Sequence, residues 1–335
     1  MTAVAWLDRL DPEQAIRVAG PKLGRLVRLR AAGIPVPAGF VVTGEAFRQA
    51  MATLGLAGEQ ADTLARLAAG ELDPAGAAAT LQPRLADCQL PAPLLSDLNT
   101  HYQQLCARRT APELPVAVRS SATVEDSATA SFAGIFVTSL GVHGADQVAA
   151  AVRRCWASLF SERALSYAAR TSVDLAAASM AVGVLELIEA TSAGVAFSMH
   201  PVTGDQQVVV IEGAWGLGEA VVSGSVTPDQ LEVSKPDGSI RRWEVRDKAR
   251  MSRPDGATGT VVEVATPDQL RRAPCLTAGQ AQQIAGYVAE VERRFGCPVD
   301  VEWVVAAGAA EDGEGSVYLT QARPISVVSP AAGRR

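Results

Sequence analysis

The stretch PVDVEWVV at residues 298–305 is followed by SVYLTQARPI at residues 316–325. Both alternate apolar and polar residues, which is typical of β-strands with one buried face. The acidic segment EDGEG at residues 311–315 lies between them. We therefore expect the two strands to pair as an antiparallel hairpin.

This hairpin would place four polar side chains on one face. Asp300 and Glu302 are two positions apart, so they project from the same face of the first strand. Gln321 and Arg323 stand in the same relation on the second strand. Carboxylate and amide oxygens suit Mg2+ shared with phosphates, and a guanidinium can grip a phosphate with two hydrogen bonds. An internal salt-bridge cluster and a solvated sheet face are the alternatives.

A second region of interest is a predicted pair of strands in the middle of the chain. PVAVRSS at residues 115–121 and GIFVTSLGV at residues 134–142 are predicted as strands, with Arg119 at the end of the first. Between them, ATVEDSATASFA is rich in small residues and carries the pair Glu125 and Asp126. We expect it to form a mobile hairpin loop. Arg119 is then a candidate phosphate ligand, with an ordinary surface arginine as the alternative.

Lys22 is the third candidate for anion binding. It follows Gly20 and Pro21 and precedes the segment Leu23–Ala32, which is predicted as a basic helix. Its ammonium would therefore lie near a helix N-terminus, a position that attracts anions. A lone lysine at such a place is also compatible with no function.

The remaining pattern predicts an α+β fold with antiparallel sheets. The Ala- and Leu-rich part from Glu45 to about Arg109 is expected to be helical, with Pro83 and Pro91 separating helices. One long amphipathic helix is predicted over residues 145–170, and a capping box at Thr277 and Gln280 opens another. Further short strands are expected at about residues 180–188, 194–199, 207–212 and 229–234.

Composition excludes several function classes. The net charge of −6 and an aromatic content of 5% argue against nucleic-acid binding. No run of about 18 apolar residues predicts a membrane span. The five cysteines form no CxxC pair, and no signal peptide is evident, so a cytoplasmic protein is expected. A P-loop, a GxGxxG fingerprint and the protein-kinase motifs are all missing from the sequence.

Several long motifs, in order, resemble one family. Residues 116–142, 194–205 and 211–229 and the C-terminal strand pair are similar to the ATP-grasp domain of phosphoenolpyruvate synthase, pyruvate phosphate dikinase and rifampicin phosphotransferase. GPKLGRLVRLRAAGIPVPAGFVVTGEAF at residues 20–47 resembles the opening of that domain. The similarity covers about residues 15–327.

The resemblance implies an ATP-grasp fold with a helical N-terminal insertion and antiparallel sheets around a nucleotide cleft. It implies an N-terminal lobe with a helical subdomain at residues 1–112 and a first ATP-grasp subdomain, with the nucleotide-covering hairpin and the long helix, at 113–190. A second subdomain with the metal- and phosphate-binding strands would follow at 191–328, and a tail at 329–335.

The resemblance also assigns roles within a Mg-ATP site. The implied catalytic residues are Lys22, Arg119 and Arg323. The residues implied to bind the nucleotide are Lys22, Arg119, Gly134, Thr138, Glu186, Ile188, Glu302, Gln321 and Arg323. The implied magnesium ligands are Asp300, Glu302 and Gln321. Gly134 and Thr138 would belong to the hairpin over the nucleotide, and residues 186–188 would contact adenine through backbone groups.

The sequence departs from the family pattern at three places. The usual opening GGKGANL reads GPKLGRL at residues 20–26, so a proline stiffens a loop that moves in the family. Leu185 stands where the family has a glutamine, which removes one expected adenine contact. His200 replaces the acidic or amide residue that normally precedes PVTG.

Members of the family relay phosphate through a histidine on a separate swivelling domain. His101, His143 and His200 are the histidines of this sequence, and none lies in a motif that resembles the phosphohistidine segment. We therefore expect a partner polypeptide that carries this histidine and passes the phosphate to a small molecule, such as a phenol. The alternatives are a non-catalytic nucleotide-binding paralogue and direct phosphorylation of a small molecule.

Overall fold

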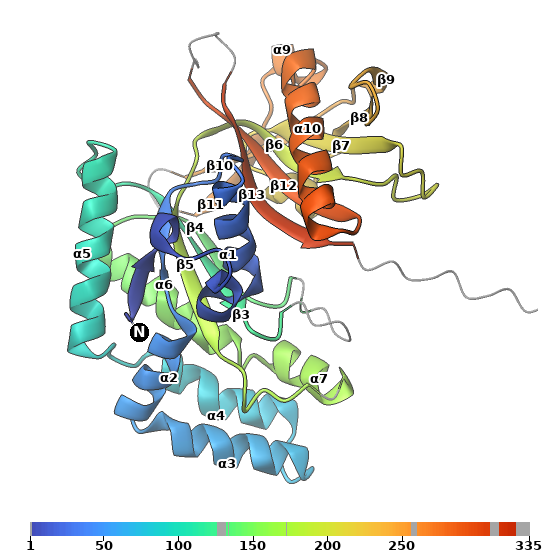
Figure 1. The fold of residues 1–335 in the computed structure, drawn as a ribbon. Coiled ribbons are helices and arrows are strands. Elements are labelled where there is room, and N and C mark those ends of the chain that lie inside the picture. Colours follow the sequence, from blue (N-terminus) through green and yellow to red (C-terminus); the bar gives the residue numbers. More distant parts are fainter. Residues whose placement is uncertain are drawn as a thin grey trace, which may run out of the picture. The chain divides into compact units, whose positions relative to one another are not determined.

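A computed structural model describes residues 2–125, 132, 134–171, 173–255, 260–308 and 315–325. The chain divides into two compact units. The first comprises Met1–Gly33, Pro37–Leu187 and Pro254–Val261, and the second comprises Ile34–Val36, Ile188–Arg253 and Val262–Arg335. Each unit has its own sheet with helices packed on it, so the mixture of helices and antiparallel sheets expected from the sequence is confirmed (Figure 1).

The sheet of the first unit has the strand order β1-β2-β5-β3-β4, and its strand pairs are antiparallel. Its strands are β1 (Val4–Trp6), β2 (Gly39–Val42), β3 (Val116–Ala122), β4 (Thr138–Val142) and β5 (Met180–Glu186). The inner strands β3 and β5 are buried along nearly their whole length, because helices pack against both strands. Arg119 does not end its strand, since β3 continues to Ala122.

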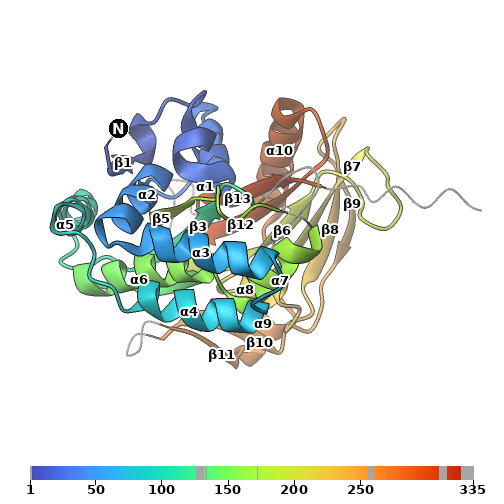
Figure 2. The same cartoon turned by 90° about the horizontal axis from the view of Figure 1, so that it is seen from below.

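Helices surround this sheet. They are η1 (Leu7–Arg9), α1 (Ala15–Ala31), α2 (Gly44–Thr53), α3 (Leu56–Ala68), α4 (Pro74–Ala86), α5 (Ala92–Arg108), α6 (Ala145–Ser158) and α7 (Glu162–Thr171). α4 packs against both α3 and α6, as Figure 2 shows from below. Phe47 of α2 meets the fully buried Trp156 of α6 edge to face, with 5.5 Å between the ring centroids.

Two helix predictions are wrong. The single helix expected over residues 145–170 is two helices, because Ser158 Oγ donates to the carbonyl of Cys155 at 2.6 Å and Ser161 Oγ accepts from the backbone N–H of Ala164 at 3.2 Å. These side-chain bonds end one helix and start the next. Pro83 lies inside α4 rather than between helices. It is exposed, so water can satisfy the carbonyl one turn earlier that its missing N–H leaves free.

The sheet of the second unit has the order β13-β12-β6-β7-β8-β9. Its strands are β6 (Ala190–Phe197), β7 (Val208–Trp215), β8 (Asp229–Ser234), β9 (Ile240–Glu244), β12 (Val299–Ala306) and β13 (Val317–Pro324). The helix α10 (Ala278–Phe295) packs on one face of this sheet and begins with the predicted capping box of Thr277 and Gln280. The smaller elements are α8 (Glu219–Val222), α9 (Asp268–Arg271), β10 (Arg250–Pro254) and β11 (Val261–Ala265).

An ion pair lies in the interior of the second unit. Lys248 and Asp229 are both fully buried, with 2.5 Å between Nζ and Oδ1. Asp229 also accepts hydrogen bonds from the backbone N–H groups of Arg246 and Cys275. Buried charges are stable only when paired and hydrogen-bonded, and this carboxylate meets both conditions.

Within the described ranges, no helix has both the length and the apolar surface needed to cross a membrane. The predicted tail at residues 329–335 and most of the acidic turn at 311–315 lie outside the described residues.

Candidate functional site

The predicted hairpin is present in the second unit. β12 and β13 pair antiparallel, with Asp300 opposite Arg323 and Glu302 opposite Gln321. Residues directly opposite each other in a ladder project from the same face, so the four side chains lie together on one side of the sheet. The strand alternation read from the sequence therefore located this cluster correctly.

Asp300 and Arg323 form a close ion pair within this cluster. Arg323 Nε donates to both carboxylate oxygens of Asp300 at 2.8 Å, and its Nη2 lies 2.7 Å from Oδ2. The side chain of Asp300 is 17% exposed and that of Arg323 is 37% exposed. The carboxylate thus holds the guanidinium at a fixed place while part of it still faces outward.

The donor set fits a magnesium ion only in combination with a ligand. Within the described residues, no three His, Cys, Asp or Glu side chains converge closely enough to hold a metal ion alone. Asp300, Glu302 and Gln321 supply two carboxylates and one amide oxygen. Mg2+ is commonly bound through one or two carboxylates together with substrate phosphates and water, so these residues suit a metal that arrives with a phosphate.

A β-bulge and a buried indole fix the strand beside Glu302. The register of β12 and β13 shifts between Glu302 and Trp303, which re-aims the neighbouring side chains. Trp303 is 1% exposed and lies on the opposite face from Glu302. A Cβ at Gly194 would lie 2.8 Å from the indole, and one at Gly213 would lie 2.7 Å from it, so only glycines leave room for this ring.

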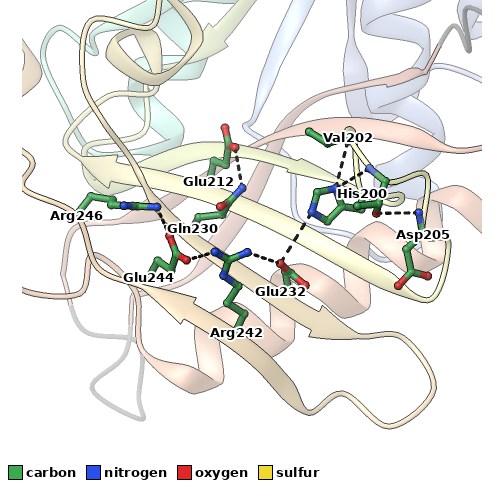
Figure 3. A network of polar contacts seen from close by, with 10 residues as sticks. His200, Val202, Asp205, Glu212, Gln230, Glu232, Arg242, Glu244 and Arg246 are labelled. Atoms are coloured by element: carbon green, nitrogen blue, oxygen red, sulfur yellow. Dashed lines mark hydrogen bonds and ion pairs between the residues drawn. The ribbon is translucent and has the colours of Figure 1, made fainter.

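The polar face extends beyond the predicted cluster. Glu302 pairs with Val195, which pairs with Glu212, which pairs with Gln230. Gln230 in turn lies opposite Glu244 on β9. Figure 3 shows the far end of this row, where Arg242 bridges Glu244 and Glu232. This continuation could not be predicted from the sequence, since an alternating pattern within single strands does not reveal their register.

His200 belongs to the same network, at the turn after β6. Its Nδ1 accepts from the backbone N–H group of Val202 at 3.1 Å (Figure 3). It also accepts from the backbone N–H group of Thr203 at 3.3 Å. Its Nε2 lies 3.9 Å from Glu232 Oε1. An imidazole nitrogen here does what the side-chain oxygen of an Asx turn does. The unusual histidine is therefore explained by the local structure.

In the first unit, Lys22 lies just after a kink in α1. Gly20 has φ 73° and ψ 168°, which breaks the helix into two segments. Pro21 begins the second segment, where its missing N–H is not needed. Lys22 Nζ is 2.5 Å from Glu125 Oε1, and the two side chains are 14% and 4% exposed.

Arg119 and Thr138 share the face of the sheet that α1 covers. Arg119 lies opposite Thr138 of β4 and opposite Gly183 of β5. A Cβ at Gly183 would lie 2.5 Å from Cδ2 of Leu23, so α1 covers this face. The structure therefore brings the elements of Lys22, Arg119 and Thr138 to one side of the sheet.

Gly134 has φ 69°, and its carbonyl accepts from Arg163 Nη1 at 3.2 Å. Most of the predicted hairpin loop, residues 126–131 and 133, lies outside the described residues.

The predicted adenine segment falls where the two units meet in sequence. Glu186 ends β5 in the first unit, and Ile188 begins the main part of the second. The Glu186 side chain binds Arg109 with Nη2–Oε2 and Nε–Oε2 distances of 2.6 and 2.9 Å. Its backbone N–H donates to the carbonyl of Ala38 at 2.8 Å. Ile188 packs with Ala193 and Val304 rather than facing outward.

Glu125 was not predicted from the sequence as the partner of Lys22. The two residues are far apart in the chain, and the only signal was a carboxylate in a run of small residues. The thiol of Cys155 lies near this pair, and burial raises its pKa to about 12, although Lys22 acts in the opposite direction. Cys155 therefore stays protonated at neutral pH and takes no part in ionic chemistry beside Lys22.

Residues 16–335 match the family model described as the pyruvate phosphate dikinase AMP/ATP-binding domain. The chain belongs to this family. The match includes every candidate residue from Lys22 to Arg323.

Named relatives agree with the family match. A probable phosphoenolpyruvate synthase of Methanothermobacter thermautotrophicus is 37% identical over 98% of this chain and 46% of its own length. The prodigiosin synthesizing transferase PigC of Serratia marcescens is 38% identical over 92% of the chain and 31% of its own length. A rifampicin phosphotransferase of a Streptomyces species is 36% identical over 94% of this chain and 35% of its own length. The chain thus spans less than half the length of these AMP/ATP-binding family relatives.

Proposed function

We propose that this chain binds Mg-ATP in an ATP-grasp fold and transfers a phosphoryl group from it to a histidine on a separate polypeptide. That histidine would then deliver the group to a small acceptor. The observation that carries the proposal is the register of β12 and β13, which gathers two carboxylates, an amide and a guanidinium on one sheet face. Membership of the AMP/ATP-binding family supports the choice of nucleotide.

The residues would act mainly by positioning and charge neutralisation, which is what phosphoryl transfer requires of a protein. Glu302 and Gln321, helped by Asp300, would hold Mg2+, and the bound ion would neutralise charge on the phosphates. Arg323, oriented by Asp300, would bind a phosphate oxygen. Lys22 and Arg119 would bind phosphate oxygens from the first unit, Gly134 and Thr138 would lie over the nucleotide, and Glu186 to Ile188 would contact adenine.

Two of the histidines have structural contacts that argue for an acceptor elsewhere. His200 Nδ1 accepts from two turn amides. The His101 ring packs against Trp6 and Phe40 at centroid distances of 5.3 and 5.4 Å, and its Nδ1 is 2.7 Å from the carbonyl of Asp97. Neither imidazole ring is placed to carry a phosphoryl group from one site to another. A histidine on a partner polypeptide fits these contacts better.

The test is transfer of label from radioactive ATP to a purified histidine-domain partner, with β- and γ-labelled nucleotide in separate reactions. We expect Arg323→Ala and Glu302→Gln to reduce labelling by about 100-fold or more while the circular dichroism spectrum is unchanged. Lys22→Ala should lower turnover more than ATP affinity.

Arg242→Ala is the matched control. Arg242 is also an ion-paired arginine of this sheet, but it lies on the edge strand β9 and should leave labelling intact. ATP binding without labelling of any partner would instead support the non-catalytic alternative. Labelling of a small molecule in the absence of a partner would support direct phosphorylation.

A further inference from the structure

The carboxylate of Glu125 contacts Lys22 in the first unit, and it is more buried than the lysine. The whole residue is 3% exposed. Besides the ion pair, its Oε2 accepts from the backbone N–H of Ala122 at 3.3 Å. A buried carboxylate is expensive unless it is paired, so the fold must hold a cation at this place.

The approach of α1 to β3 brings that cation there. At the kink, Gly20 lies so close to Ser121 that a Cβ would be 2.3 Å from the Ser121 carbonyl oxygen. Ser121 Oγ then accepts from the backbone N–H of Leu23 at 3.3 Å. These contacts on both sides of Lys22 fix its backbone against the end of β3, three residues before Glu125.

The backbone of Glu125 is anchored as well. Its N–H donates to the carbonyl of Ala122 at 3.1 Å, and its carbonyl accepts from Phe132 at 3.0 Å. Phe132 is fully buried and stacks on Phe136 with 5.3 Å between centroids. Glu125 therefore has a fixed place that does not depend on a ligand.

We propose that Glu125 is a positioning residue that aims the Lys22 ammonium at the transferred phosphate. The inference rests on the proposed function of Lys22. An ammonium has three N–H donors on a flexible stem, so one bond to Glu125 restricts its position and leaves two donors for phosphate oxygens. Because phosphoryl transfer depends on positioning, a lysine without this restraint would bind ATP yet transfer poorly.

The first measurement does not require activity. The sequence has only three lysines, Lys22, Lys235 and Lys248, so amine labelling can be followed site by site by peptide mass spectrometry. In Glu125→Gln, the Lys22 ammonium loses its charged partner, and we expect trinitrobenzenesulfonate to label it about three-fold faster or more. The control is Glu292→Gln, which breaks the Lys235–Glu292 pair, also 2.5 Å long, in the second unit. It should speed labelling of Lys235 and leave Lys22 unchanged.

The second measurement is kinetic. Glu125→Gln should lower the rate of partner labelling about 10-fold or more while the Kd for Mg-ATP from calorimetry changes less than about three-fold. Glu292→Gln should leave both unchanged. If Glu125→Gln does not fold, Glu125→Asp takes its place, since it keeps the charge and shortens the side chain by one methylene.

The outcomes separate the two proposals. Unchanged Lys22 labelling in the Glu125 variant overturns the positioning role, and so does faster labelling with full transfer activity. If the wild-type chain neither binds ATP nor transfers a phosphoryl group from it, the proposed function fails. Labelling alone then decides whether Glu125 restrains Lys22.

Discussion

Gly20 is the residue on which the geometry of Lys22 depends most directly. It combines a positive φ of 73° with a backbone contact to Ser121 that leaves no room for a Cβ. Either condition favours glycine, and together they require it. The kink is therefore set by one residue and then kept by Pro21.

We expect Gly20→Ala to destabilise the first unit by about 2–4 kcal/mol. The alanine would have to adopt an unfavourable positive φ, and its Cβ would clash with the backbone of Ser121. Lys22 should also label faster with an amine reagent as its position loosens. Gly33→Ala is the matched control. Gly33 has φ 80° but no atom within 4 Å of the place where a Cβ would lie, so it should cost only about 1 kcal/mol. Urea unfolding measures the free energy of unfolding of both variants. Equal losses in the two would contradict this explanation of the kink.

Single residues differed in how well the sequence predicted them. Asp300 and Arg323 were found because strand alternation and a short connection determine which side chains share a face. The pairing of Lys22 with Glu125 was not found, because it joins segments about 100 residues apart through tertiary packing. Local patterns carry no information on such contacts.

Among the elements, the turn after β6 shows how an unexpected side chain can preserve a structure. His200 Nδ1 accepts from two successive backbone N–H groups, a role that an asparagine oxygen can fill at a similar distance from the backbone. Because Nδ1 accepts, the neutral ring carries its proton on Nε2, on the side of Glu232.

His200→Asn should therefore leave the free energy of unfolding within about 0.5 kcal/mol of wild type, whereas His200→Ala should lower it by about 1–2 kcal/mol. The free energy of unfolding falls in the alanine variant because the two backbone N–H groups that donate to His200 Nδ1 lose their protein acceptor. Chemical denaturation of the three proteins measures the differences. If asparagine were as damaging as alanine, the histidine would have to act through its contact with Glu232 instead.

The helices and strands were largely predictable where apolar residues recurred with a regular period along the sequence. The hairpin of β12 and β13 and the capping box of α10 follow from the sequence. The break between α6 and α7 does not, since Ser158 and Ser161 interrupt an apolar stripe that continues on both sides of them. Side-chain bonds to the backbone decided the outcome against the periodicity.

At the scale of the whole molecule, the candidate residues belong to two units. Lys22, Arg119 and Thr138 lie in the first, and Asp300, Glu302, Gln321 and Arg323 lie in the second. Our proposal assigns both sets to one bound nucleotide, and this assignment predicts a linked response of the two units to ATP.

Mg-ATP at about 100 times its Kd should stabilise the chain by about 2.7 kcal/mol. Hydrogen exchange read by mass spectrometry should slow in peptides of both α1 and the β12–β13 hairpin, and chelation of Mg2+ should weaken the effect in both. Arg242→Ala is the control and should give the wild-type pattern. Protection confined to one unit would show that the two sets of residues do not serve the same nucleotide.

Trp303 and its two facing glycines restrict how this sequence can diverge. The indole occupies space that exists only because Gly194 and Gly213 have no side chains. A descendant that enlarges Gly213 must also lose the indole, whereas position 194 requires glycine in either case, because a Cβ there would lie 1.9 Å from the carbonyl oxygen of Glu212. Positions 303 and 213 are therefore expected to vary together, and chains that exchange the tryptophan have room for a larger residue at 213. Since Trp303 follows Glu302 directly, a substitution in this buried set would also shift the backbone that positions Glu302 on the polar face.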